Sequence, residues 1–282
     1  MMLTEQNYYS AEMNKKYCSA SQYLSFIGRP AIPGCEARTM AEINGEYQEE
    51  TSKAMLIGSI LDALWEGATT EELVDRFPDC VSSRGATKGQ IKSEYMQSIQ
   101  LYQRTLKDDL FRRYMSGKKQ IIMTGEIEGL PFKIKMDSFH PGVAIVDLKT
   151  TQDSHPAHRY YNKMTGERLP FYLWWGYQTQ LAIYREIVRQ NTGEELPCFI
   201  AAIDKKPHPR PEVIQLDDVL LDEALESVKQ NCEKIIMLKS GEIDPIRCDS
   251  DDCDYCRDTY TCKGVTSGEF ETMDDKGGND AA

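Results

Sequence analysis

The segment 119–149 constrains the fold more than any other part of the chain, because it reads as three short β-strands. Its three runs are rich in β-branched and aromatic residues: 119–127 (KQIIMTGEI), 131–138 (PFKIKMDS) and 143–149 (VAIVDLK). A Glu-Gly pair separates the first two runs, and a His-Pro-Gly tripeptide separates the last two. Both are turn signals, so we expect an antiparallel meander of three strands.

Helical patterns lie on both sides of these strands. Apolar residues at helical spacing predict helices over 54–65, 177–190 and 216–238, and residues 70–118 are amphipathic and helical in character. Residues 197–204 (PCFIAAID) predict one further buried strand. The order of helices, three strands, helix, strand and helix indicates an α/β fold with one central mixed sheet flanked by helices.

The composition suggests four parts. We expect an N-terminal helical segment at 1–53, a core at 54–246, a cysteine-rich segment at 247–262 and a tail at 263–282. The tail is polar, acidic and glycine-containing, which predicts disorder.

The charge balance limits how the chain can bind nucleic acid. Lys and Arg number 33 against 45 Asp and Glu, which gives a net charge of −12 and excludes a uniformly basic surface. Any DNA contact must come from a local basic face. Three groups of cations are candidates, and each is equally consistent with a solvated surface: Arg84, Lys88 and Lys92; Arg112, Arg113, Lys118 and Lys119; Lys205, Lys206 and Arg210.

Sequence signals for a membrane or export are missing. No apolar run approaches the roughly 18 residues that span a bilayer, and the N-terminal residues lack the order of a signal peptide. We therefore expect a soluble, cytoplasmic protein that has no membrane partner.

A possible catalytic group lies at the end of the predicted strands. Asp147 and Lys149 are two residues apart on one strand and so share one face of the sheet, and Asp137 ends the preceding run. Two carboxylates and an ammonium suit a Mg²⁺- or Mn²⁺-dependent phosphodiester hydrolase, because carboxylates bind hard cations and the lysine stabilises charge on the phosphate. The alternative is a surface salt bridge on an edge strand.

Further polar residues in apolar surroundings support the hydrolase hypothesis. Asp62 is a lone carboxylate in an apolar helix, one turn after Gly58, and it needs a cation or hydrogen-bond donors if it is buried. Gln180 and Tyr184 are four residues apart on a packed helical stripe, which suggests a positioned hydrogen bond. Glu126 could face the phosphate. The alternatives are a helix-edge aspartate and a core tyrosine beside a tolerated glutamine.

Taken in order, these residues resemble a known family. Gly58 and Asp62, then Asp137, then Asp147-Leu148-Lys149, then Gln180-x-x-x-Tyr184 resemble the PD-(D/E)XK nuclease superfamily, and within it the phage exodeoxyribonuclease VIII (RecE-like) branch. The segments YCSASQYLSF and CEARTMAEINGEY are also similar to this branch, so the resemblance runs over most of residues 8–262. Many members have a histidine where this chain has Asp62.

The resemblance has consequences for the function and the fold. It implies a restriction-endonuclease-like core and a metal-dependent exonuclease that degrades linear DNA for phage-type recombination. Asp62, Asp137 and Asp147 would bind the metal, and Lys149, Gln180 and Tyr184 would complete the catalytic site. A single-strand annealing protein would be the partner, in a bacterium or in the cytoplasm of a phage-infected host. Two alternatives remain: a non-enzymatic zinc-ribbon module that binds DNA or protein, and a site-specific endonuclease of the same fold.

The cysteines form a second candidate site. The spacing Cys253-x2-Cys256-x5-Cys262 indicates a bound metal or cluster, and the fourth ligand is either Cys248 in a local zinc site or the distant Cys35. The pattern is similar to that of AddB-type and CRISPR-associated iron–sulfur nucleases, which implies a [4Fe–4S] cluster on Cys35, Cys253, Cys256 and Cys262. Zn²⁺ is the alternative.

Overall fold

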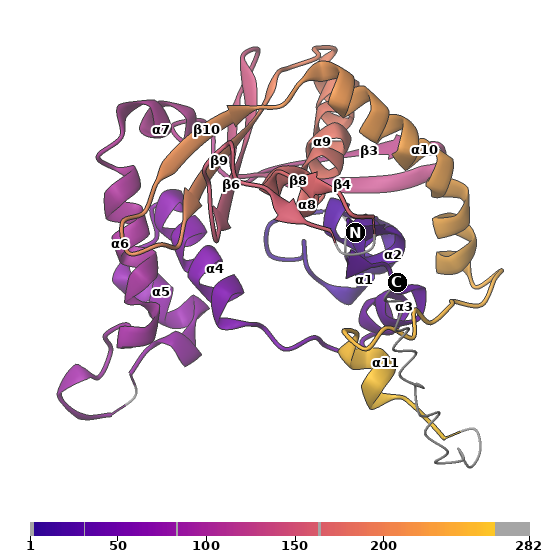
Figure 1. Cartoon of the computed structure of the whole chain (residues 1–282), viewed down its shortest axis with the longest axis horizontal. Coiled ribbons are helices and arrows are strands. Elements are labelled where there is room, and N and C mark those ends of the chain that lie inside the picture. The colour runs from indigo at the N-terminus through magenta and orange to yellow at the C-terminus, as the bar shows by residue number, and fades with distance from the viewer. Residues whose placement is uncertain (1–2, 31, 83, 163–164, 263–282) are drawn as a thin grey trace, which may run out of the picture.

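The computed structural model describes residues 3–30, 32–82, 84–162 and 165–262, so the predicted acidic tail lies outside the described residues. A four-stranded sheet in the order β10-β9-β6-β5 lies at the centre of the fold (Figure 1). Its strands are β5 (Ser138–His140), β6 (Ala144–Thr151), β9 (Cys198–Asp204) and β10 (Pro211–Gln215). The pair β6–β9 is parallel and both outer pairs are antiparallel. This arrangement confirms the predicted mixed sheet.

The predicted three-stranded meander is wrong in one respect. Strand β3 (Ile121–Ile127) pairs with β4 (Leu130–Met136) as a separate hairpin, and the short β5 takes the place beside β6. The β5–β6 register would bring Met136 opposite Leu148 if the ladder continued. Instead the Asp137 side chain accepts the hydrogen bond of the Leu148 backbone N–H, at 2.8 Å. The ladder therefore ends at Asp137.

Alternation along β6 separates its two faces. Ala144, Val146 and Leu148 face a core formed with α4 (Lys53–Glu66), α6 (Met96–Thr105) and α7 (Asp109–Tyr114). Ile145 faces the opposite core, which places Asp147 and Lys149 on that same side. The sequence prediction that these two side chains share a face is consistent with this arrangement.

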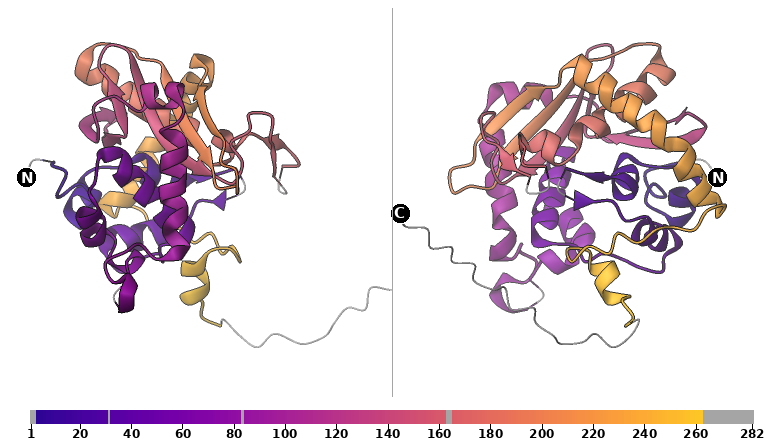
Figure 2. Two further views of the ribbon diagram at one scale, coloured as in Figure 1. Left: turned by 90° about the vertical axis from the view of Figure 1, so that its left-hand side faces the viewer. Right: turned by 45° about the vertical axis from the view of Figure 1, so that its right-hand side comes forward.

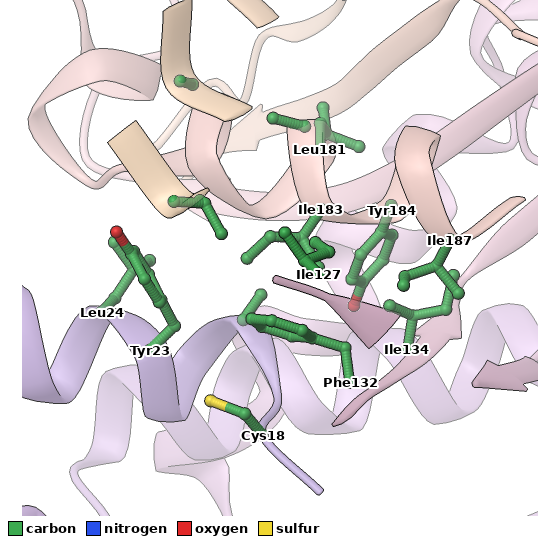
Figure 3. Close-up of a cluster of buried hydrophobic side chains, with 14 of the residues drawn as sticks. Cys18, Tyr23, Leu24, Ile127, Phe132, Ile134, Leu181, Ile183, Tyr184 and Ile187 are labelled. Atoms are coloured by element: carbon green, nitrogen blue, oxygen red, sulfur yellow. The ribbon is translucent and has the colours of Figure 1, made fainter. Parts of the chain in front are cut away.

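The larger core lies on that second side. It contains the β3–β4 hairpin, α9 (Tyr177–Thr192), α10 (Asp218–Ser240) and the N-terminal helix α2 (Ala20–Ile27). Figure 3 shows Ile183 and Ile187 of α9 on the side of the helix that faces Phe132 of β4. The N-terminal helices therefore pack into the same core as the sheet.

Other elements complete the fold. The helices are α1 (Ala11–Lys16), α3 (Glu36–Asn44), α5 (Thr70–Arg76), α8 (Phe171–Trp174), α11 (Asp254–Asp258) and the 3-10 turns Pro78–Cys80, Gly85–Thr87 and Ser93–Tyr95. The short strands are β1 (Gly28–Arg29), β2 (Ile32–Pro33), β7 (Tyr160–Tyr161) and β8 (Arg168–Leu169). The chain after α10 runs along the N-terminal helices to α11 (Figure 2). Within the described part of the chain, no helix is both long and apolar enough to cross a membrane.

Candidate active site

The predicted carboxylates and lysine converge where β4 gives way to β5. Asp137 lies at that junction and Asp147 lies opposite on β6, where it is 2% exposed. The Lys149 ammonium lies 2.5 Å from Asp147 Oδ2 and 4.8 Å from the centre of the Tyr177 ring. Asp147 Oδ2 is buried, and its partner among the described residues is the Lys149 ammonium.

Helix α9 supplies the polar contacts that orient Asp147. Gln180 Nε2 donates to Asp147 Oδ1 at 2.7 Å and to the Tyr184 hydroxyl at 3.1 Å. The Tyr184 hydroxyl in turn donates to the Lys135 carbonyl oxygen at 3.1 Å. Among the described residues, the Tyr184 hydroxyl forms hydrogen bonds with Gln180 and the backbone of β4, and with no carboxylate. It acts on Asp147 through Gln180.

Asp62 reaches the same cleft from α4. A Cβ at Gly58 would lie 3.3 Å from Thr150 Oγ1, so the small residue lets α4 approach β6 closely. Burial raises the pKa of Asp62 to about 6, and the charges of Glu66 and Asp147 add to the rise while Lys135 and Lys149 oppose it. Gln120 Nε2 is 3.4 Å from Asp62 Oδ2.

The carboxylates of this site repel one another. Burial raises the pKa of Asp137 well above its usual range, and the neighbouring Asp62 and Asp147 charges raise it further. Burial lowers the pKa of Lys149, but Asp147, Tyr177 and Asp137 raise it by more, so this lysine is protonated at neutral pH. The Lys149 ammonium alone does not balance three carboxylates, and oxygen donors of this kind fit a divalent cation.

A cleft of about 970 Å³ surrounds these residues. Cations and aromatic rings also line it: Arg29, Arg38, Lys133, Lys135, Lys205, Tyr8, Tyr9, Trp175 and Tyr177. Of the cations proposed from the sequence, Lys205 lines the cleft and the others do not. Sequence reasoning missed Lys133 and Lys135, although they alternate with buried residues along β4. It also missed Arg29 and Arg38, which reach the cleft only because α2 and α3 pack against each other.

One sequence-based suggestion is not supported, and one aromatic run contributes a single ring to the cleft. Glu126 is exposed on β3 and is not among the residues lining the cleft, so its suggested role toward phosphate is not supported. In the aromatic run 171–175, Phe171 is buried and the Trp174 ring stacks on Tyr160. Trp175 is the member of this run that lines the cleft.

The cysteines gather at a second place, beside α3 and α11. The Sγ atoms of Cys35, Cys248, Cys253 and Cys256 all lie within 4.8 Å of one another. Cys262 is exposed and outside this group, so its prediction as a ligand beside Cys35 does not match the structure. The chain instead turns back after α10 and brings Cys248 to the position expected for Cys262.

A family model and a solved structure place the chain among known proteins. A family model described as "PDDEXK-like domain of unknown function (DUF3799)" matches residues 19–259. A crystal structure of a protein from Eubacterium rectale, described as a "Putative exonuclease", has 42% sequence identity and a TM-score of 0.87, over 95% of this chain and 97% of that one. A structure of SSO0001 has 13% identity and a TM-score of 0.26, over 67% of this chain and 80% of that one, and is too remote to support an argument. No curated protein matches the chain.

Proposed function

Because this chain belongs to the PDDEXK-like DUF3799 family of the PD-(D/E)XK nuclease superfamily, we propose that it is a divalent-metal-dependent exonuclease that degrades linear DNA. One observation carries the proposal. Asp137, Asp147 and Lys149 meet at one end of the sheet, with Gln180 bonded to Asp147. The Eubacterium rectale protein, with its 42% identity, favours an exonuclease over other nuclease activities.

The donor set fits Mg²⁺ or Mn²⁺. Asp62, Asp137 and Asp147 would hold the cation, since burial and the neighbouring Asp147 charge raise the pKa of both Asp62 and Asp137, and hard cations prefer carboxylate oxygens. When bound, such a cation supplies positive charge at the scissile phosphate and lowers the pKa of water.

The chain's own residues have separable roles in this proposal. Lys149 is protonated, so its ammonium stabilises negative charge on the phosphate and does not act as a base. Gln180 holds Asp147 in one orientation by its 2.7 Å hydrogen bond. Tyr184 fixes the Gln180 amide and is a positioning residue.

The lining of the cleft suits a DNA end. Arg29, Lys135 and Lys205 can contact phosphates, although the chain as a whole is acidic. The rings of Tyr9 and Trp175 line the same cleft, where they can stack on unpaired bases. Removal of one strand from an end leaves single-stranded DNA, which is what a single-strand annealing partner would use in phage-type recombination.

Topologically different substrates test this proposal. The protein is incubated with Mg²⁺ and either a linear duplex or the same sequence as a covalently closed circle. We expect the linear DNA to disappear through progressively shorter products while the circle persists. Cleavage of both at equal rates would make the protein an endonuclease, and cleavage of neither would remove the nuclease proposal.

A further inference from the structure

Four cysteine sulfurs gather outside the cleft, beside α3 and α11, and the nuclease proposal does not use them. Cys35 Sγ lies 3.6 Å from Cys256 Sγ, and Cys248 Sγ lies 3.8 Å from the same atom. All four sulfurs, including that of Cys253, fall within 4.8 Å of one another. Cys35, Cys253 and Cys256 are buried, and all four are free thiols.

The spacing of the sulfurs points to a single ion. Zinc–sulfur bonds of about 2.3 Å in a tetrahedron put the sulfurs roughly 3.8 Å apart, which is close to the two distances observed. A [4Fe–4S] cluster binds its four cysteines through four different irons, so their sulfurs lie farther apart than sulfurs on one ion. We propose that Cys35, Cys248, Cys253 and Cys256 bind one Zn²⁺, and that Cys262 is not a ligand.

The local sequence and backbone suit such a site. Cys253 is the residue before α11 and Cys256 lies in its first turn, so their two-residue separation places both sulfurs at one helix end. Cys35 has the matching place before α3, where the Arg38 backbone N–H faces its sulfur at 3.5 Å. Backbone donors of this kind stabilise thiolates.

The apolar cluster that packs around the α11 segment is small. The buried cluster around it consists of Cys35, Cys253 and Cys256, with Ala37, Cys248 and Tyr255 partly buried against them. A cluster this small cannot supply the apolar burial that fixes the other helices. Metal binding would contribute the missing free energy, as it does in small metal-dependent domains.

Zinc at this place would join the two ends of the chain beside the cleft. Cys35 and Cys256 are 221 residues apart in sequence. The Ala37 N–H donates to the Ile246 carbonyl at 3.1 Å, so the C-terminal segment already follows α3. Arg38 and Glu42 of α3 line the cleft. The ion would therefore hold one wall of the cleft and take no part in chemistry, so the inference stands whether or not the protein is a nuclease.

Metal analysis of anaerobically purified protein tests the proposal, because a cluster would survive those conditions. The expected result is a colourless protein with about one zinc per chain and no iron. A brown protein with about four irons per chain would overturn the proposal, as would a protein without zinc. Replacement of the zinc by Co²⁺ should give the absorption of a tetrahedral thiolate site, and an octahedral spectrum would contradict it.

Two matched variants identify the ligands. Cys248→Ser should lose the zinc, whereas Cys262→Ser should retain it, and the reverse pattern would refute the ligand set. If Cys248→Ser does not fold, titration of the wild-type protein with an organomercurial keeps the test decisive. The reagent also reacts with the exposed Cys262. If all of the zinc is released before Cys262 and three further thiols have reacted, a four-cysteine site is contradicted.

Discussion

A double-mutant cycle on Gln180 and Tyr184 tests how α9 controls Asp147. Gln180 donates to the Asp147 carboxylate at 2.7 Å, and such charge-assisted bonds contribute about 1.5–3 kcal/mol. If the bond persists into the transition state, Gln180→Leu should lower kcat about 10- to 150-fold. Tyr184→Phe removes the hydroxyl's bonds to the Lys135 carbonyl and to the Gln180 amide. Only the neutral bond to Gln180 bears on Asp147, and it contributes about 1 kcal/mol, so a roughly 5-fold loss of kcat is expected.

The double variant gives the decisive comparison. Since Tyr184 acts through Gln180, Tyr184→Phe should have little further effect on kcat once Gln180 is Leu. Single-turnover cleavage of a linear duplex at saturating Mg²⁺ measures the four rates, and unfolding midpoints show whether each variant remains folded. Losses that multiply in the double variant would refute the argument and give Tyr184 an independent role.

Three further predictions follow from charges in the cleft. Without added divalent cation, Asp62→Asn should be more stable than wild type at pH 7.5 but not at pH 4. Folded Asp62 has a pKa of about 6 against an ordinary 3.8, so its contribution to stability falls as pH rises through this range, by at most about 3 kcal/mol. Denaturant unfolding measures this: the same difference in free energy of unfolding between Asp62→Asn and wild type at both pH values would contradict the prediction. Lys149→Gln should lower kcat by about 100-fold or more while DNA affinity changes little. Single-turnover cleavage measures the first quantity, and DNA binding without metal measures the second. A loss confined to affinity would assign Lys149 to DNA binding. Lys135→Gln should lower DNA affinity and reduce the slope of log Kd against log salt by about 1, and an unchanged slope would mean that Lys135 contacts no phosphate.

The periodicity of side chains within single elements was sufficient to predict the centre of the candidate site, around Asp147 and Lys149. The two-residue spacing of Asp147 and Lys149 predicted a shared face, and the helical stripe predicted 177–190 against the observed α9. Both patterns depend only on backbone geometry within one element. The Gln180 contact to Asp147 then follows from the packing of α9 on the sheet.

Features that depend on contacts between segments far apart in the sequence could not be predicted from local periodicity. Strand β10 (PEVIQ) has a weak strand pattern and forms because β9 offers it an edge. Buried Lys133 is accepted in the core because its ammonium donates to Asn14 Oδ1 at 2.7 Å and to the Tyr8 carbonyl, over more than a hundred residues. The choice between Cys248 and Cys262 likewise depends on the path of the chain after α10, which cysteine spacing does not specify.

One measurement tests most directly the central claim that Asp147 anchors a metal-dependent nuclease site. The rate of linear duplex degradation in Mg²⁺ is compared for the wild type, Asp147→Asn and a control, Asp75→Asn, which changes an exposed aspartate on α5. Asp147→Asn should remain folded and lose cleavage by at least about 100-fold, because a carboxylate that binds the cation is removed. The control should cleave like the wild type. An Asp147→Asn protein that degrades linear DNA at the wild-type rate would contradict this account of the site.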